Sequence, residues 1–239
     1  MPRFFEPSIS RENIILSVEN SRHITKSLRM KPGDVITLSD ANGIDCEAEL
    51  VSVGERVHAR VLELRKNTSE PSVEVTLYQA LPKVGKFETI VQKSVELGVS
   101  RIVPMLTSRC VSRPDQKAMQ RKIERYQKIC SEAAKQSGRG KIPEIGQLME
   151  YTDVLDVMGS YDCCLFFYEE GGKEIGSLLP ETVKTVAIVI GSEGGFSQEE
   201  VQAAQEKGAC IATLGPRILR CETAPITALS ILMYLTKNL

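Results

Sequence analysis

Two segments near the end of the chain, residues 186–196 (VAIVIGSEGGF) and 211–224 (IATLGPRILRCETA), constrain its fold more than any other feature. Each begins as an apolar run typical of a buried parallel strand and ends in glycine and a polar loop, with a helical pattern beyond. Open α/β sheets bind ligands at such strand ends. Two of them in succession predict a small molecule held mainly by main-chain N–H and C=O groups.

The spacing of the glycines argues against a dinucleotide site. Gly191, Gly194 and Gly195 give G-x-x-G-G, whereas the dinucleotide fingerprint is G-x-G-x-x-G. The position about 20 residues after Gly191, where an acid would bind ribose, holds Ile211. A Rossmann dehydrogenase is therefore disfavoured.

Length and composition exclude several classes of protein. The 239 residues allow one large or two modest domains. No apolar run approaches the roughly 20 residues of a membrane span, and the first residues lack the pattern of a signal peptide. The seven cysteines include no C-x-x-C pair and no nearby histidine that would suggest a zinc site. We therefore expect reduced thiols, no metal, no membrane association and a cytoplasmic location.

Charge is unevenly distributed along a chain whose net charge is −1. Residues 1–82 carry −2, residues 83–141 carry +9 and residues 142–239 carry −8. A strongly basic stretch in a neutral protein indicates binding of a polyanion, because neutralised phosphates release counterions. For four of these charges, Arg121, Lys122, Arg125 and Lys128, a solvated helix face is the favoured explanation. The other basic residues are spread over several elements, which favours nucleic acid.

Local patterns divide the chain into two regions. The first shows turn signals and short strands, expected over residues 3–5, 14–17, 35–38, 45–53 and 57–64, with a helix over 23–30. This pattern predicts a small β-barrel. Residues 66–71 are polar and end in proline, which is typical of a linker.

After the linker, strands and helices alternate. Strands are expected over residues 73–81, 102–106, 163–168, 185–190 and 210–214. Helices are expected over residues 87–97, 117–136, 154–158, 198–207 and 226–237. The alternation predicts an α/β fold with a mainly parallel sheet covered by helices. The last helix is apolar on nearly every side, so it is either packed deeply in its domain or part of a subunit interface.

Several motifs together resemble one known family. They are GSEGGF (191–196) followed by LGPRILRCETA (214–224), with PRFF, KFETIVQKSVELGV and SEAAKQSGRGKIP upstream. In this order they closely resemble the RsmE family of 16S ribosomal RNA uridine-N3 methyltransferases, of the SPOUT superfamily, over essentially the whole chain. Two departures are small: Ser192 stands where proline is common, and Cys221 stands where threonine is usual.

The resemblance implies a fold, a cofactor and partners. Residues 1–70 would form a PUA-like β-barrel that helps to hold RNA. Residues 71–239 would form a SPOUT-type domain with a deep trefoil knot, a feature that periodicity alone cannot suggest. The resemblance also implies a homodimer that binds S-adenosyl-L-methionine in the knot. The substrate would be uracil N3 of a specific uridine in 16S ribosomal RNA, either naked or in the small subunit.

The expected cofactor site combines close backbone approach at glycine with apolar walls. Its expected residues are Ile190, Gly191, Glu193, Gly194, Gly195, Leu214, Gly215, Ile218, Leu219, Thr223 and Ala224. Phosphates of the RNA are expected to contact basic residues of both regions. The residues assigned to this role are Arg3, Arg29, Lys83, Lys86, Arg109 and Arg139.

Methylation at uracil N3 requires loss of the N3 proton or stabilisation of the anion that is delocalised onto O2 and O4. Arg220 is the candidate for the stabilising charge, and Glu193 or Glu222 is the candidate proton acceptor. Each has a structural alternative: Arg220 could pair with Glu222, and Glu193 could cap the helix that opens near Ser197. Two other functions stay open, methylation of a different RNA atom and RNA binding without catalysis.

Overall fold

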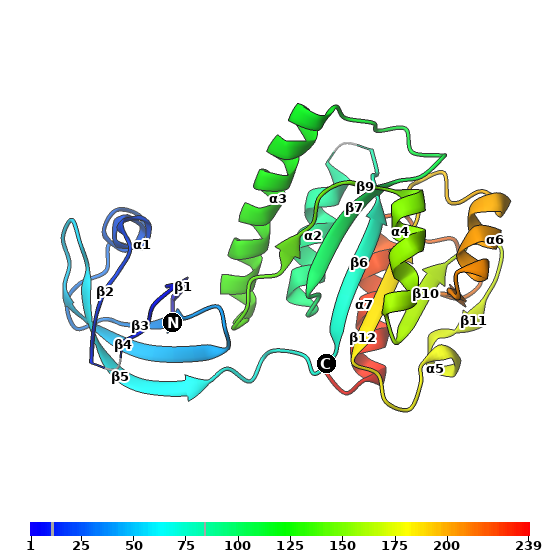
Figure 1. Ribbon diagram of the computed structural model, residues 1–239. Helices are drawn as coiled ribbons and strands as arrows, with labels where there is room; N and C mark the ends of the chain where they lie inside the picture. Colours follow the sequence, from blue (N-terminus) through cyan, green and yellow to red (C-terminus); the bar gives the residue numbers. More distant parts are fainter. Residues whose placement is uncertain (11, 84) are drawn as a thin grey trace. The chain divides into compact units, whose positions relative to one another are not determined.

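The computed structural model describes residues 1–10, 12–83 and 85–239. Contacts divide the chain into two compact units, which are described separately (Figure 1). Unit 1 comprises Met1–Glu70 together with Ala134–Ile142. Unit 2 comprises Pro71–Ala133 and Pro143–Leu239.

Unit 1 is built on a five-stranded sheet. Its strands, in spatial order, are β1 (Arg3–Phe5), β3 (Val35–Ser39), β4 (Ile44–Ser52), β5 (His58–Lys66) and β2 (Asn13–Ile15). The pairing of β1 with β3 is parallel and the other pairings are antiparallel. The apolar core includes Phe4, Leu16, Ile36 and Leu50, all at most 1 % exposed. The strands expected in this region are thus confirmed.

The helix of unit 1 begins earlier than the sequence pattern predicts. It consists of α1 (Val18–Arg22) and a π-helical continuation, η1 (His23–Leu28), rather than one helix over residues 23–30. Ser17 caps its first turn, because the Ser17 side chain accepts a hydrogen bond from the N–H of Asn20. The expected strand over residues 14–17 therefore ends at Ile15.

Unit 2 contains an eight-stranded sheet in which every strand pairing is parallel. Seven strands follow the order β11 (Lys173–Glu174), β13 (Cys210–Thr213), β10 (Cys163–Phe167), β12 (Thr185–Ile190), β6 (Glu74–Ala80), β7 (Arg101–Leu106) and β8 (Glu144–Ile145). The eighth, β9 (Met149–Glu150), pairs with β7. The predicted parallel sheet is confirmed, whereas the two-residue strands are too short to produce a sequence pattern.

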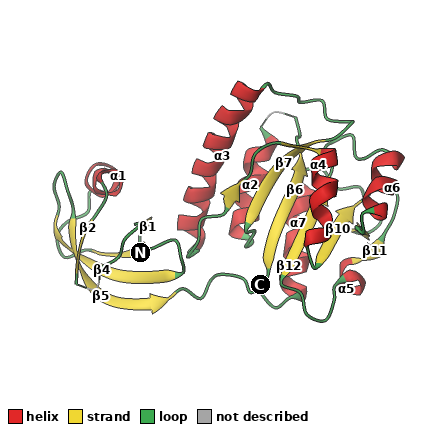
Figure 2. Ribbon diagram, viewed as in Figure 1, coloured by secondary structure: helices red, strands yellow, loops and turns green. Residues whose placement is uncertain are grey.

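Helices of unit 2 pack on the sheet (Figure 2). They are α2 (Lys86–Glu96), α4 (Tyr151–Val157) with a 3-10 turn η2 (Met158–Ser160), α5 (Ile175–Leu178), α6 (Gln198–Glu206) and α7 (Thr223–Leu235). The long helix α3 (Gln116–Ser137) stacks Tyr126 on Phe87 of α2, and its residues from Ala134 on belong to unit 1. The last helix contacts α2, α5 and β12. Within the described residues, no helix is both long enough and apolar enough to cross a bilayer.

The last helix is buried on one side and exposed on the other. Leu229, Leu232 and Met233 are fully buried. Tyr234 is 72 % exposed and Leu235 41 % exposed. Packing within the unit therefore accounts for the apolar residues on one face of α7. The apolar residues on the other face are exposed to solvent.

Candidate cofactor and RNA site

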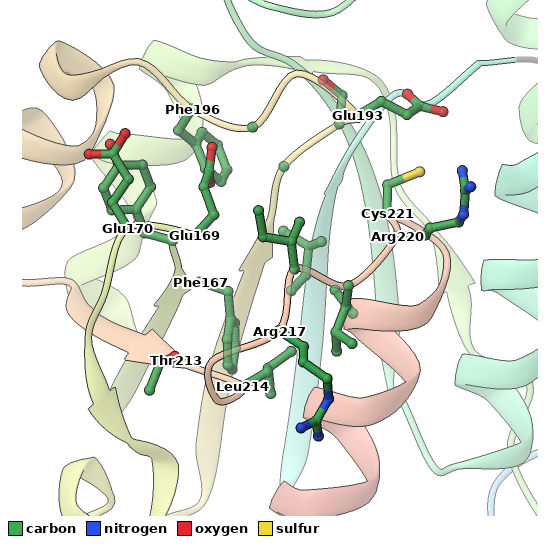
Figure 3. Close-up of a pocket in the computed structure, with 18 of the residues that line it drawn as sticks. Phe167, Glu169, Glu170, Glu193, Phe196, Thr213, Leu214, Arg217, Arg220 and Cys221 are labelled. Atoms are coloured by element: carbon green, nitrogen blue, oxygen red, sulfur yellow. The ribbon is translucent and has the colours of Figure 1, made fainter.

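A cavity of about 790 Å³ opens at the carboxyl ends of β10, β12 and β13 (Figure 3). These three strands are neighbours in the sheet, so the loops that leave them meet at one edge. The first glycine loop (residues 191–197) follows β12, the second glycine loop (residues 214–222) follows β13, and the β10 loop (residues 168–172) follows β10. All three contribute to the wall of the cavity.

The first glycine loop turns so tightly that glycine is required within it. Gly195 has φ of +65°, and a Cβ at this position would lie 2.0 Å from Glu169 Oε1. A Cβ on Gly194 would lie 2.9 Å from the Cβ of Arg109. The loop ends where Ser197 and Glu200 form a capping box at the start of α6. Ser197, and not Glu193, therefore caps this helix.

The second glycine loop carries an apolar edge and leads directly into α7. Gly215 has φ of +96° with open space around it. Ile218 is 84 % exposed and lines the cavity. The carbonyl of Arg220 accepts hydrogen bonds from the N–H groups of Thr223 and Ala224, which fixes the end of the loop to the helix.

The cofactor residues expected from the sequence come together with one exception. Ten of the eleven line the cavity, and Thr223 is outside the lining. The β10 loop was missed, although Phe167, Tyr168, Glu169, Glu170 and Gly171 all line the cavity. Its signal was present: the apolar run over residues 163–167 also ends in polar residues and two glycines.

Comparison with known proteins agrees with this geometry. Residues 68–233 match the family described as RNA methyltransferase domain, and residues 16–62 match the RNA methyltransferase PUA domain. Ribosomal RNA small subunit methyltransferase E of Bacillus subtilis (strain 168) is 36 % identical over 230 residues, covering 92 % of this chain and 90 % of the relative.

The chain belongs to the ribosomal RNA small subunit methyltransferase E family. The relative from Mesomycoplasma hyopneumoniae (strain 232) is 34 % identical and covers 96 % of this chain and 98 % of its own length. The crystal structure of the family member from Neisseria gonorrhoeae, bound to S-adenosyl methionine, has a TM-score of 0.90 and 32 % identity, and each chain is 98 % covered. The expected family and PUA domain are thus confirmed.

One wall of the cavity in this methyltransferase carries a charged cluster. Lys86 Nζ lies 2.9 Å from Glu193 Oε1 and 3.1 Å from Glu222 Oε2. The main-chain N–H of Lys83 also donates to the Glu193 carboxylate, at 3.2 Å to each oxygen. The Cys221 thiol donates to Glu222 Oε2 at 3.2 Å. The ion pair of Glu222 is thus with Lys86, and not with Arg220 as considered from the sequence.

The cluster holds both carboxylates ionised. Burial acts to raise the pKa of Glu193, but hydrogen bonds from Lys86 and from main-chain N–H groups lower it to about 2. For Glu222, burial is outweighed by the hydrogen bonds from Cys221 and Lys86, and its pKa is lowered. Hydrogen bonds to the two glutamates raise the pKa of Lys86. Burial and the bond to Glu222 raise the pKa of the Cys221 thiol to about 12. At neutral pH the cluster therefore contains one cation, two anions and a neutral thiol.

Arg220 is exposed next to this cluster. Figure 3 shows Arg220 and Glu193 at one end of the cavity and Glu169 with Glu170 at the other. Arg217 is directed away from Glu193 (Figure 3). The cavity therefore has a catalytic candidate, Arg220, at the end where the ionised cluster lies.

The six residues expected to contact RNA occupy three different environments. Arg29 and Lys83 are exposed. Lys86 is in the charged cluster, and Arg109 donates to the carbonyl of Gly194 at 3.0 Å. Both therefore contact the first glycine loop.

The other two, Arg3 and Arg139, are paired within unit 1, Arg3 partly buried and Arg139 buried, contrary to the expected phosphate contact. Arg3 pairs with both oxygens of Asp45, at 2.7 and 2.8 Å. Arg139 is 4 % exposed and binds both oxygens of Glu70, at 3.2 and 2.8 Å. Each guanidinium faces a carboxylate of its own unit, which sequence alone does not reveal.

Proposed function

We propose that this protein uses S-adenosyl-L-methionine to methylate N3 of a specific uridine in 16S ribosomal RNA of the small subunit. The observation that carries the proposal is the cavity at three parallel strand ends, in a chain 32 % identical to a family member bound to S-adenosyl methionine. The names of the relatives, ribosomal RNA small subunit methyltransferase E, support small-subunit ribosomal RNA as the substrate. The assignment of N3 as the methylated atom is based on the family resemblance.

The residues of the cavity fit this cofactor. Its volume of about 790 Å³ lies within the usual range for small-molecule sites. A Cβ on Gly195 would collide with Glu169, so the main chain of the first glycine loop approaches the cavity as only glycine allows. Ile190, Leu214 and Leu219 supply apolar surface. When bound, the cofactor supplies a methyl group already activated on a sulfonium.

The chain itself must orient the reacting groups and stabilise charge on the uracil. Because Glu193 and Glu222 are held ionised with lowered pKa values, each is a weak base for the N3 proton. Arg220 is exposed at the same end of the cavity and is free of that cluster. We therefore assign to Arg220 the stabilisation of the anion that develops on O2 and O4.

RNA contacts outside the cavity are assigned to exposed cations. Arg29 of unit 1 and Lys83 of unit 2 keep the role expected from the sequence. Exposed residues of α3 extend the basic surface, among them Arg121 and Lys117. These side chains would neutralise phosphates without reading the base sequence.

Three further properties belong to the same proposal. A trefoil knot in residues 71–239 is inferred from membership of the family. The homodimer is supported by the exposed apolar face of α7, where Tyr234 and Leu235 lie. Light scattering that detects a stable, fully active monomer would rule the dimer out. A cytoplasmic location follows from the proposed ribosomal substrate.

Methyl transfer to RNA tests the proposal. The protein is incubated with methyl-labelled cofactor and either naked 16S ribosomal RNA or assembled small subunits, and the RNA is digested to nucleosides. We expect labelled 3-methyluridine from at least one of the two substrates. Label on ribose or on another base would indicate a different RNA methyltransferase. Cofactor binding without transfer to either substrate would indicate an RNA-binding protein that has lost catalysis.

A further inference from the structure

Lys86 lies between the two glycine loops and contacts a carboxylate from each. Its Nζ is bonded to Glu193 of the first glycine loop and to Glu222, the last residue of the second. Nζ also lies 3.7 Å from the sulfur of Cys221. Lys86 is the first residue of α2 and is 135 positions from Cys221 in the sequence. One side chain thus joins three segments that are distant in the chain.

The first glycine loop has additional attachments to the sheet. The side-chain amide of Gln79 donates to the carbonyl of Gly191 at 3.1 Å, and Arg109 donates to that of Gly194. The second glycine loop is fixed at its end by the bonds of the Arg220 carbonyl to α7. Lys86 connects these two separately anchored loops through an ion pair with each, beside a neutral link from the Cys221 thiol to Glu193, and the loops line the cavity.

Charge makes this connection necessary. Both carboxylates lie within hydrogen-bond distance of one nitrogen, so they are close enough to repel each other strongly when no cation separates them. The groups that would remain are the Lys83 main-chain N–H on Glu193 and the Cys221 thiol, which bonds both glutamates. Both are neutral. Arg220, two residues before Glu222 in the sequence, is exposed and makes no ion pair with either glutamate among the described residues.

We propose that Lys86 is a positioning residue that sets the spacing of the two glycine loops, and thereby the affinity of the cavity for its cofactor. The inference rests on the proposed function, because a change in the spacing of the loops is detected through the affinity for S-adenosyl-L-methionine. It replaces the phosphate contact expected for Lys86 from the sequence. The contact with two ionised glutamates at once explains why this lysine is unavailable to RNA.

Calorimetry of S-adenosyl-L-methionine and of its neutral product, S-adenosylhomocysteine, tests the inference. Lys86→Met should weaken both ligands by about tenfold near pH 8, the size of one coupled pair. Both ligands need the same loop spacing. The loss of affinity should therefore be the same for the cofactor, which carries a sulfonium charge, and for the product, which does not. Lys86→Arg, which keeps the cation, should retain most of the affinity. Lys93→Met is the matched control, since Lys93 lies in the same helix and pairs with Glu96 in its own turn, away from the glycine loops.

Two measurements distinguish a positioning role of the Lys86 charge from a role of its side chain in packing alone. In Lys86→Met the carboxylates lose their cation and their pKa values rise, so one of them can take a proton as the pH falls. The loss of affinity should therefore be smaller near about pH 5.5 than near about pH 8. The double variant Lys86→Met with Glu222→Gln removes one of the repelling charges and should recover affinity at both pH values. Should Lys86→Met fail to fold, Lys86→Gln carries the same expectations.

Each outcome has one meaning. If the unaltered protein binds neither ligand, the proposed function fails and Lys86 is not at issue. If it binds both ligands and Lys86→Met binds them equally well, the positioning role is overturned. A loss that is the same at both pH values and is not recovered in the double variant also overturns it. A loss of RNA affinity with unchanged cofactor affinity would return Lys86 to the phosphate contacts.

Discussion

The molecule contains two kinds of ionic cluster, and the difference between them separates stability from function. In unit 1, Arg3 and Arg139 each meet their own carboxylate: the Arg139 and Glu70 side chains are 5 % and 18 % exposed, and the charge of each pair is balanced. In unit 2 a single lysine serves two carboxylates at the wall of a cavity, with all three side chains 27–28 % exposed. A balanced, buried pair holds a fold together. An unbalanced cluster beside a cavity is typical of a site that must respond to a ligand.

The largest effect is expected from breaking the buried pair in unit 1. Arg139→Met leaves the Glu70 carboxylate in a mostly buried position with only the main-chain N–H groups of Gly140 and Lys141. We expect a loss of about 3–5 kcal/mol in the free energy of unfolding. Urea denaturation measures it. The control is Arg121→Met, an exposed position of α3, the helix that ends two residues before Arg139, and equal small losses in both variants would contradict a stabilising role for Arg139.

Arg220→Ala should have the largest effect on chemistry. We expect the single-turnover methylation rate to fall by about 10²–10³-fold, the value of one oxyanion-type contact, with little change in cofactor affinity. Rapid-quench measurements with saturating RNA give the rate. Arg217→Ala, in the same loop but directed away from Glu193, is the comparison. If the two variants lose rate equally, a general loss of loop charge explains the effect.

Part of the pH dependence of stability should originate in unit 1. Burial acts to raise the pKa of Glu70, but the Arg139 hydrogen bonds and charge outweigh it, so the pKa lies below its ordinary value of 4.5. A carboxyl with a lowered folded pKa stabilises the protein above the unfolded value, and this contribution disappears as the pH falls through the folded pKa. We expect stability to decline below about pH 4.5, and Glu70→Gln to make the decline shallower. Urea midpoints measured from pH 7 downward test this, and an unchanged slope in Glu70→Gln would contradict it.

The smallest effect is expected at the exposed cations. Replacing Lys83 with Met should weaken RNA binding and reduce the slope of log affinity against log salt by roughly one counterion unit. Replacing Arg3 should leave that slope unchanged, because its guanidinium is bonded to Asp45. Filter binding over a range of salt concentrations distinguishes them. A change of slope in the Arg3 variant would contradict the claim that a cation paired within its own unit does not contact the phosphates of the RNA.

The sequence predicted the elements and one half of the site well, because both depend on local patterns. Apolar runs that end in glycine located β12, β13 and the glycine loops, and the cavity lies there. The β10 loop was overlooked because its glycines, Gly171 and Gly172, follow two acidic residues and belong to no familiar motif. Partners of charged groups could not be predicted, since Lys86 and Glu222 are far apart in sequence. Arg139 was misjudged for the same reason: a basic stretch does not show which cations are already paired.

Cofactor affinity in two glycine variants tests the central claim most directly. Gly195→Val and Gly215→Val each place a β-branched residue at positive φ, and at Gly195 the new Cβ also meets Glu169. We predict that calorimetry detects no binding of S-adenosyl-L-methionine to either variant, while circular dichroism shows that the protein remains folded. Near-normal affinity in both variants would contradict a cofactor site formed by the two glycine loops.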